Sequence, residues 1–159
     1  HHGAKRARAH ALILQFGEKP MHSSAILQPV VVLALWSGVM MLWLARARLP
    51  NAKTTRFPEG GIAHPSAMVH FPTEVRRVGD NYNHLFEQPT LFYAVVLLIA
   101  VMGHVDGTAV ALAWGFVGLR VVHSLVQATV NIVPLRFGLF ILSWLALLGL
   151  MVREALVIF

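Results

Sequence analysis

The chain has 159 residues, of which 57% are hydrophobic and only 13% are charged, against roughly 25% charged residues in an ordinary soluble domain. This composition argues against a water-soluble fold. The absence of cysteine excludes disulfides, thiolate metal sites, iron–sulfur clusters and a cysteine nucleophile. The net charge of +6 could suit nucleic acid, but six of the 13 Lys and Arg residues lie between the first two apolar runs. That distribution is typical of a membrane protein with one basic loop, so we expect no nucleic-acid partner.

The chain begins with a His pair and first reaches a methionine at Met21. We therefore interpret residues 1–20 as a tag or a flexible N-terminal arm, with a native basic arm as the alternative, and leave them out of the fold. Residues 21–159 are expected to form a single four-helix transmembrane domain.

Residues 25–45 are uncharged and match the roughly 20 residues that cross a hydrocarbon core, so they predict a first spanning helix. Arg46 and Arg48 follow it, where their side chains can reach lipid head groups. Residues 46–79 are polar and interrupted by prolines and glycines, which predicts an irregular surface loop. Because basic residues collect in cytoplasmic connections, we expect the 46–80 loop to face the cytoplasm.

The second apolar run, 88–103, is short for a span, so its helix is expected to start near Tyr82 and to carry Glu87 into the membrane. After a tight turn, residues 108–130 predict a third span. Pro134 disfavours helix at the residue before it, and residues 137–157 predict a fourth. The expected fold is all-α, an integral membrane four-helix bundle that runs up, down, up and down.

This serial topology brings the unusual polar residues to the basic-loop side of the membrane. On the third helix, Arg120, His123 or Ser124, Gln127 and Asn131 recur at helical spacing and form one polar stripe. A charge at the bilayer centre costs at least roughly 2.5–3.5 kcal/mol on insertion scales, so Arg120 is expected to pair with Glu87. The candidate ligand-binding residues are Arg46, Arg48, Asn83, His84, Glu87, Arg120, His123, Gln127 and Asn131, together with Arg136.

Each candidate also has a purely structural interpretation. Glu87 and Arg120 can form a buried pair without a ligand, and His123 can be a packed core histidine. Basic residues such as Arg46 commonly end a span. Pro89 cannot donate to the carbonyl of residue 85; it is either a kink or a first-turn proline, or it frees an acceptor beside the cluster. No hydrolase, P-loop or zinc-protease motif is present, so no metal is expected, and the polar residues are too one-sided for a channel.

Two motifs resemble those of the MAPEG family, the membrane-associated proteins in eicosanoid and glutathione metabolism, and of its bacterial branch in particular. The first is N-x-L-F-E-x-P-x-L-F-Y, which covers residues 83–93. The second is R-x-x-H at Arg120 and His123, followed by Asn131 and Arg136. The resemblance covers residues 21–159. The R-x-R sequence formed by Arg46 and Arg48 at the end of the first helix is also similar to that of the family.

The resemblance implies a homotrimer with glutathione bound between neighbouring subunits near the cytoplasmic face of a bacterial inner membrane. It implies that Glu87, Arg120 and His123 hold the peptide or order the site, that Arg46 or Arg48 holds a carboxylate, and that Arg136 faces the thiol as the catalytic residue. A guanidinium near a thiol lowers the thiol's pKa and stabilises the attacking thiolate.

The subunits of this implied homotrimer are four-helix bundles embedded in the lipid bilayer. Its substrates are implied to be hydrophobic small molecules that reach the site from the bilayer.

The chain departs from the well-characterised transferases of the family at several positions, and an arginine expected early in the second-helix motif is absent, with Asp80 and Asn83 nearby instead. Gln127 stands where they carry a tyrosine, and Phe137 and Phe140 stand where the fourth helix offers hydroxyl residues. Two hypotheses follow. The first is a membrane-bound glutathione-dependent transferase or peroxidase acting on hydrophobic electrophiles, and the alternative is a non-catalytic lipid-binding or accessory membrane protein.

Overall fold

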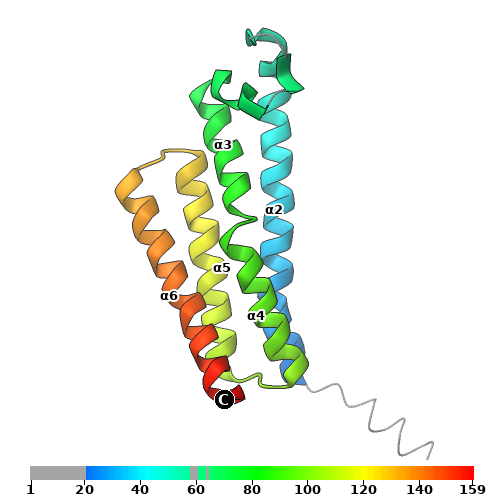
Figure 1. Cartoon of the computed structure of the whole chain (residues 1–159), viewed down its shortest axis with the longest axis vertical. Helices are drawn as coiled ribbons and strands as arrows, with labels where there is room; N and C mark the ends of the chain where they lie inside the picture. Colours follow the sequence, from blue (N-terminus) through cyan, green and yellow to red (C-terminus); the bar gives the residue numbers. More distant parts are fainter. Residues whose placement is uncertain (1–20, 58–60, 64) are drawn as a thin grey trace, which may run out of the picture.

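The computed structural model describes residues 21–57, 61–63 and 65–159, so the interpretation of residues 1–20 lies outside the described part of the chain. The described residues form an elongated bundle of antiparallel helices (Figure 1). Four helical segments are long and apolar enough to cross a membrane, by length and composition. The prediction of an all-α bundle with four spans is therefore confirmed.

The first span is α2, Met21–Thr54, which continues nine residues past the predicted end at residue 45. Pro50 lies in its last turns, where the ring removes only one backbone hydrogen bond. Side chains support the helix beyond this point, because Asn51 Nδ2 donates to the carbonyl of Ala47 at 2.8 Å. Arg48 lies over the ring of Phe71, 5.4 Å from its centroid, and this contact holds the end of α2 against the following segment.

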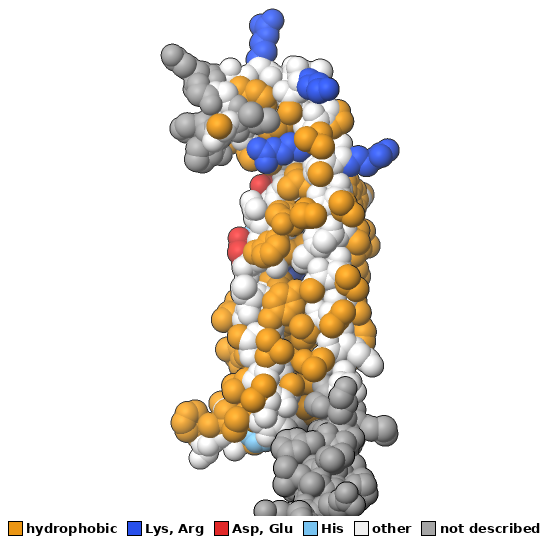
Figure 2. Space-filling model, turned by 90° about the vertical axis from the view of Figure 1, so that its right-hand side faces the viewer, with side chains coloured by type: hydrophobic (Ala, Val, Ile, Leu, Met, Phe, Trp, Pro, Cys, Tyr) orange, Lys and Arg blue, Asp and Glu red, His pale blue; other side chains and the backbone are white. Residues whose placement is uncertain are grey.

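The predicted irregular loop over residues 46–79 is wrong in large part. After α2 come two short 3₁₀ helices, η1 (Gly61–Ala63) and η2 (Pro65–His70), and then α3 (Thr73–His84). Residues 58–60 and 64 of the predicted loop lie outside the described residues. Polarity and prolines suggested a loop, but α3 is amphipathic and buries Val75 and Val78. Figure 2 shows Lys and Arg side chains gathered at this end, above a face covered by hydrophobic side chains.

The second span consists of α3 and α4 (Gln88–Met102), separated by a break at residues 85–87. A single helix from Tyr82 was predicted, so this part of the prediction is wrong. Pro89 has no N–H to donate, and the chain instead closes a turn in which the N–H of Phe86 bonds the carbonyl of Asn83 at 2.9 Å. The break leaves carbonyl groups at the end of α3 available to other partners.

The third and fourth spans are α5 (Gly107–Ala128) and α6 (Val133–Ile158), which pack along each other (Figure 1). The helix α6 starts at Val133, although Pro134 was expected to disfavour helix there. Proline is tolerated in a first helical turn because its missing N–H would have no partner in any case. Gly103, at φ 73°, ends α4 in the left-handed conformation that glycine adopts without strain.

The core runs along the inside of the bundle and is mainly apolar, with a few buried polar side chains, among them Arg120 and Gln88. The rings of Phe92 and Phe116 stack with centroids 4.4 Å apart and are fully buried. Most of each span remains uncovered, since only 17–39% of the apolar windows is buried inside the chain. Exposed Leu, Val and Phe side chains on the outer faces match a bundle whose surface is solvated by lipid.

Candidate functional site

Arg120 spans the break between α3 and α4. Its guanidinium is 1% exposed and donates to the carbonyl of His84 at 2.6 Å and to Oε1 of Gln88 at 3.2 Å. The predicted ion pair with Glu87 is wrong, because the Glu87 side chain is 63% exposed and pairs with His84 instead. The break explains the difference: it offers the cation the carbonyl oxygen of His84 at the negative end of α3, which partly replaces a carboxylate.

Gln88 is a buried residue of the site that the sequence analysis did not single out. Its Oε1 accepts a hydrogen bond from Arg120 and lies 3.1 Å from the hydroxyl of Ser143 on α6, whose single proton is shared with the carbonyl of Phe140 at 2.8 Å. One buried amide oxygen thus joins three helices. The available signals were the place of Gln88 beside Glu87 in the motif and the fact that Ser143 is the only hydroxyl residue in the fourth apolar run.

His84 and Glu87 form a pair at the break. Nδ1 of His84 lies 2.9 Å from Oε2 of Glu87. The ring of His84 stands perpendicular to the ring of His123, with centroids 6.3 Å apart. His123 is 4% exposed and belongs to the same polar stripe of α5 as Arg120. The break and α5 therefore bring an imidazole pair and a carboxylate together.

A cleft of about 190 Å³ opens beside this pair. It is lined by polar residues from three segments and by apolar residues of α6; these are His84, His123, Val133, Arg136, Phe137 and Phe140. One wall of the cleft can therefore carry charge, whereas the other is hydrocarbon. Such a combination suits a reaction between a polar nucleophile and an apolar partner.

Arg136 lies in the first turn of α6, where the preceding turn of the chain holds its side chain. Its NH1 donates to Oδ1 of Asn131 at 2.9 Å. Asn131 has a φ of 50°, a left-handed conformation that asparagine adopts more readily than most residues, and its N–H bonds the carbonyl of Val126 at 2.7 Å. This strained turn orients the guanidinium of Arg136 beside the cleft.

A second cleft, of about 380 Å³, lies between α3 and the end of α5. Its lining is mixed in charge and consists of Met68, Val69, Thr73, Arg76, Arg77, Asp80 and Asn131. NH1 of Arg77 donates to the carbonyl of Thr129 at 3.0 Å, which ties α3 to the end of α5. Asn131 lines this cleft and also binds Arg136 of the first, so the two clefts adjoin. Arg76 and Arg77 lie in the 46–79 segment, which the sequence analysis interpreted as a surface loop.

The remaining predicted residues do not reach the first cleft within one chain. Arg46 and Asn83 are exposed, and Arg48 lies on Phe71. Gln127 is buried, and its Oε1 has no hydrogen-bond partner among the described residues. The structure therefore brings together His84, Glu87, Arg120, His123, Asn131 and Arg136, and leaves the other candidates apart.

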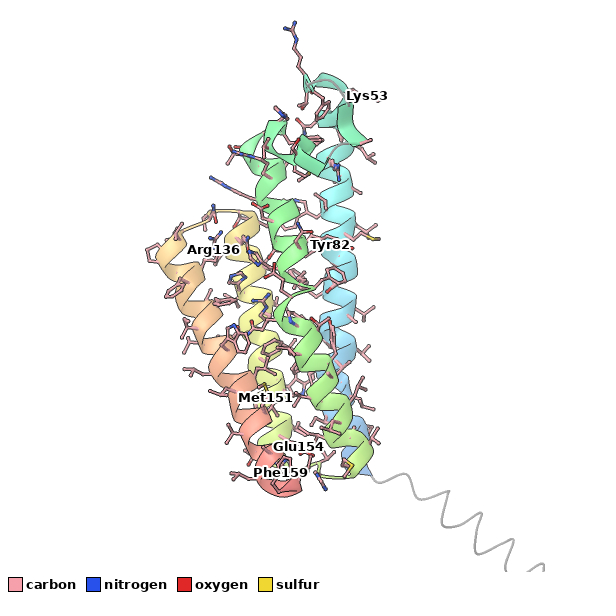
Figure 3. The ribbon with its side chains drawn as sticks, viewed as in Figure 1. Lys53, Tyr82, Arg136, Met151, Glu154 and Phe159 are labelled. Atoms are coloured by element: carbon pink, nitrogen blue, oxygen red, sulfur yellow. The ribbon has the colours of Figure 1, made fainter. Side chains whose placement is uncertain are left out.

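A separate polar cluster closes the opposite end of the bundle, where Figure 3 shows Glu154, far from Arg136. His104 Nδ1 lies 2.7 Å from the buried carboxylate of Glu154. Arg153 binds Oδ2 of Asp106 at 2.6 Å and the carbonyl of His104 at 2.8 Å. The N–H of Ala109, followed by Arg153, lowers the pKa of Asp106. This cluster fastens the turn between α4 and α5 to the end of α6.

Comparison with known proteins gives one finding. A model of the MAPEG family matches residues 26–156, which is most of the chain. Searches of curated proteins and of solved structures give no significant match. The match includes both motifs from which the resemblance was recognised and all or nearly all of each apolar span. The chain is an integral membrane protein that belongs to the MAPEG family.

Proposed function

We propose that the chain is a membrane-bound glutathione-dependent transferase or peroxidase that acts on hydrophobic electrophiles. The observation that carries this proposal is the cleft in which Arg136 adjoins His84 and His123 on one side and Phe137 and Phe140 on the other. Membership of the family supports a glutathione-related activity in a membrane.

Arg136 is the residue placed to stabilise the thiolate. A guanidinium beside a thiol lowers the pKa of the thiol and keeps the nucleophilic thiolate at neutral pH. Because the cleft is small and partly apolar, this electrostatic effect is screened less than it would be in water. The hydrogen bond to Asn131 fixes the direction of the guanidinium before a ligand arrives.

The adjoining cleft suits the peptide part of glutathione. Arg76 and Arg77 provide positive charge for carboxylates, and Asp80 provides negative charge for an ammonium group. Arg46 and Arg48 do not reach either cleft in one chain. In the proposed homotrimer they would approach the clefts of a neighbouring subunit, which is the arrangement that a site between subunits requires.

The direct test uses purified protein and glutathione. Calorimetry should detect binding, and the bound thiol should show thiolate absorbance near neutral pH. Arg136→Ala should abolish most of that absorbance, whereas Lys53→Ala, which removes an exposed cation from the same end, should leave it unchanged. Absence of binding, or equal absorbance in both variants, would contradict the proposal.

A non-catalytic lipid-binding or accessory role is the second candidate. It is favoured by Gln127, Phe137 and Phe140, which place no hydroxyl group where a transferase of the family carries one. A cleft between subunits that holds lipid and no glutathione would support this role. Turnover of a chlorinated aromatic test substrate would exclude it.

We also propose that the protein resides in a bacterial inner membrane with the 46–80 loop in the cytoplasm. The basic residues of that loop and their absence from the turn between α4 and α5 support this orientation. The chain has no cysteine, so single substitutions Lys53→Cys and Thr108→Cys allow labelling without background. An impermeant thiol reagent added outside intact cells should label only the second variant.

A further inference from the structure

His84 occupies a position that the backbone fixes on both sides. It is the last residue of α3, and its carbonyl accepts the hydrogen bond from the buried guanidinium of Arg120 at 2.6 Å. The following break turns the chain so that Glu87 comes back toward the imidazole. The ring itself lines the first cleft together with His123 and Arg136. A rigid backbone thus presents an imidazole to the cleft.

The carboxylate of Glu87 determines which ring nitrogen is available. Nδ1 of His84 is 2.9 Å from Oε2 of Glu87, so a proton on Nδ1 is held in that hydrogen bond. The neutral imidazole then has an unprotonated Nε2 that can accept a proton. In the described part of the chain, Nε2 has no hydrogen-bonding partner. This is the carboxylate–imidazole arrangement that a general base requires.

The other imidazole of the cleft lacks these features. His123 is 4% exposed, its Nδ1 is buried without a hydrogen bond, and it has no carboxylate partner among the described residues. The charged and titratable groups around His84 are Glu87 from the break, Arg120 and His123 from α5, and Arg136 from α6. Of these, only Glu87 can neutralise a protonated imidazole.

We infer that His84, oriented by Glu87, is the base that removes the thiol proton of a glutathione bound in the first cleft. This inference rests on the proposed function. The S–H bond breaks, the proton binds Nε2 of His84, and the electron pair remains on sulfur as a thiolate facing Arg136. Glu87 balances the imidazolium. When the thiolate has attacked the electrophile, the same proton is available to the leaving group or to the adduct.

The test separates deprotonation from binding. Stopped-flow measurement of thiolate absorbance should show formation slowed by roughly 10²–10⁴-fold in His84→Ala, the usual contribution of a general base. Added imidazole should restore part of the rate. Glu87→Gln should slow the step as well, and His70→Gln, which changes an exposed histidine of η2, should not. Calorimetry with S-methylglutathione, which has no thiol proton, should give the same affinity in all variants.

Each outcome has a definite meaning. If the wild-type protein binds neither peptide, the proposed function fails and the inference fails with it. If the wild-type protein binds glutathione and forms the thiolate, but His84→Ala forms it at the same rate, His84 is not the base and the proposed function stands. If the rate falls without rescue by imidazole and S-methylglutathione also binds less tightly, His84 has a structural role only, and the inference is overturned.

Discussion

The coupling free energies between Arg120 and its neighbours Gln88 and Glu87 can be measured with two double-mutant cycles. Arg120→Met removes two hydrogen bonds from a charged donor, each worth about 1.5–3 kcal/mol, but it also removes a charge that costs about 2.5–3.5 kcal/mol in a membrane. At the middle of these ranges the two hydrogen bonds together outweigh that cost by about 1–2 kcal/mol, so the single change should destabilise the fold by about that amount. Gln88→Leu removes the acceptor of both Arg120 and Ser143, so it should destabilise the fold by about 2–4 kcal/mol.

The coupling energies then distinguish the contacts. Arg120 and Gln88 touch at 3.2 Å, so their coupling should be about 1.5–3 kcal/mol. Arg120 and Glu87 make no ion pair among the described residues. Their coupling, measured with Glu87→Gln, should stay below about 0.5 kcal/mol. Unfolding in mixed detergent micelles, followed by circular dichroism, gives the four free energies of each cycle. A larger coupling for Glu87 than for Gln88 would refute the assignment.

Three further predictions concern the ends of α6 and the core. The pKa of Asp106 is lowered by the N–H of Ala109 and by Arg153. The carboxylate therefore contributes stability above its unfolded pKa, and this contribution is lost as the pH falls through the folded pKa. The melting temperature measured against pH should fall in acid, and the fall should be smaller in Asp106→Asn. Arg153→Ala should cost about 1–2 kcal/mol because it frees the turn between α4 and α5, and a melting temperature equal to the wild-type value would contradict this. Ser143→Ala should cost about 0.5–1.5 kcal/mol in the same micelle assay, since it removes one donor to a buried amide oxygen, and a stabilised variant would oppose that account.

The sequence predicted the spans well and their boundaries less well. Apolar runs located all four spans because their length is set by the membrane. Hydropathy carries no information about helix that continues into water, so the extension of α2 to Thr54 and the start of α3 at Thr73 were missed. Pro89 was interpreted as a kink, a first-turn proline or the source of a free carbonyl, and in the structure it lies in the first turn of α4, directly after a break at residues 85–87.

What the sequence determined by itself was the helical class, the number of spans and the end of the bundle at which the polar residues meet, because oil requires long apolar helices with all backbone groups bonded. Only the tertiary structure decided which polar groups touch. Arg120 donates to a carbonyl and an amide oxygen in place of a carboxylate, and Glu87 pairs with His84. His104, in the turn between α4 and α5, pairs with Glu154 near the C-terminal end of α6. These contacts depend on how each helix is rotated and on where α3 breaks, and a rotation of one residue position would change every partner.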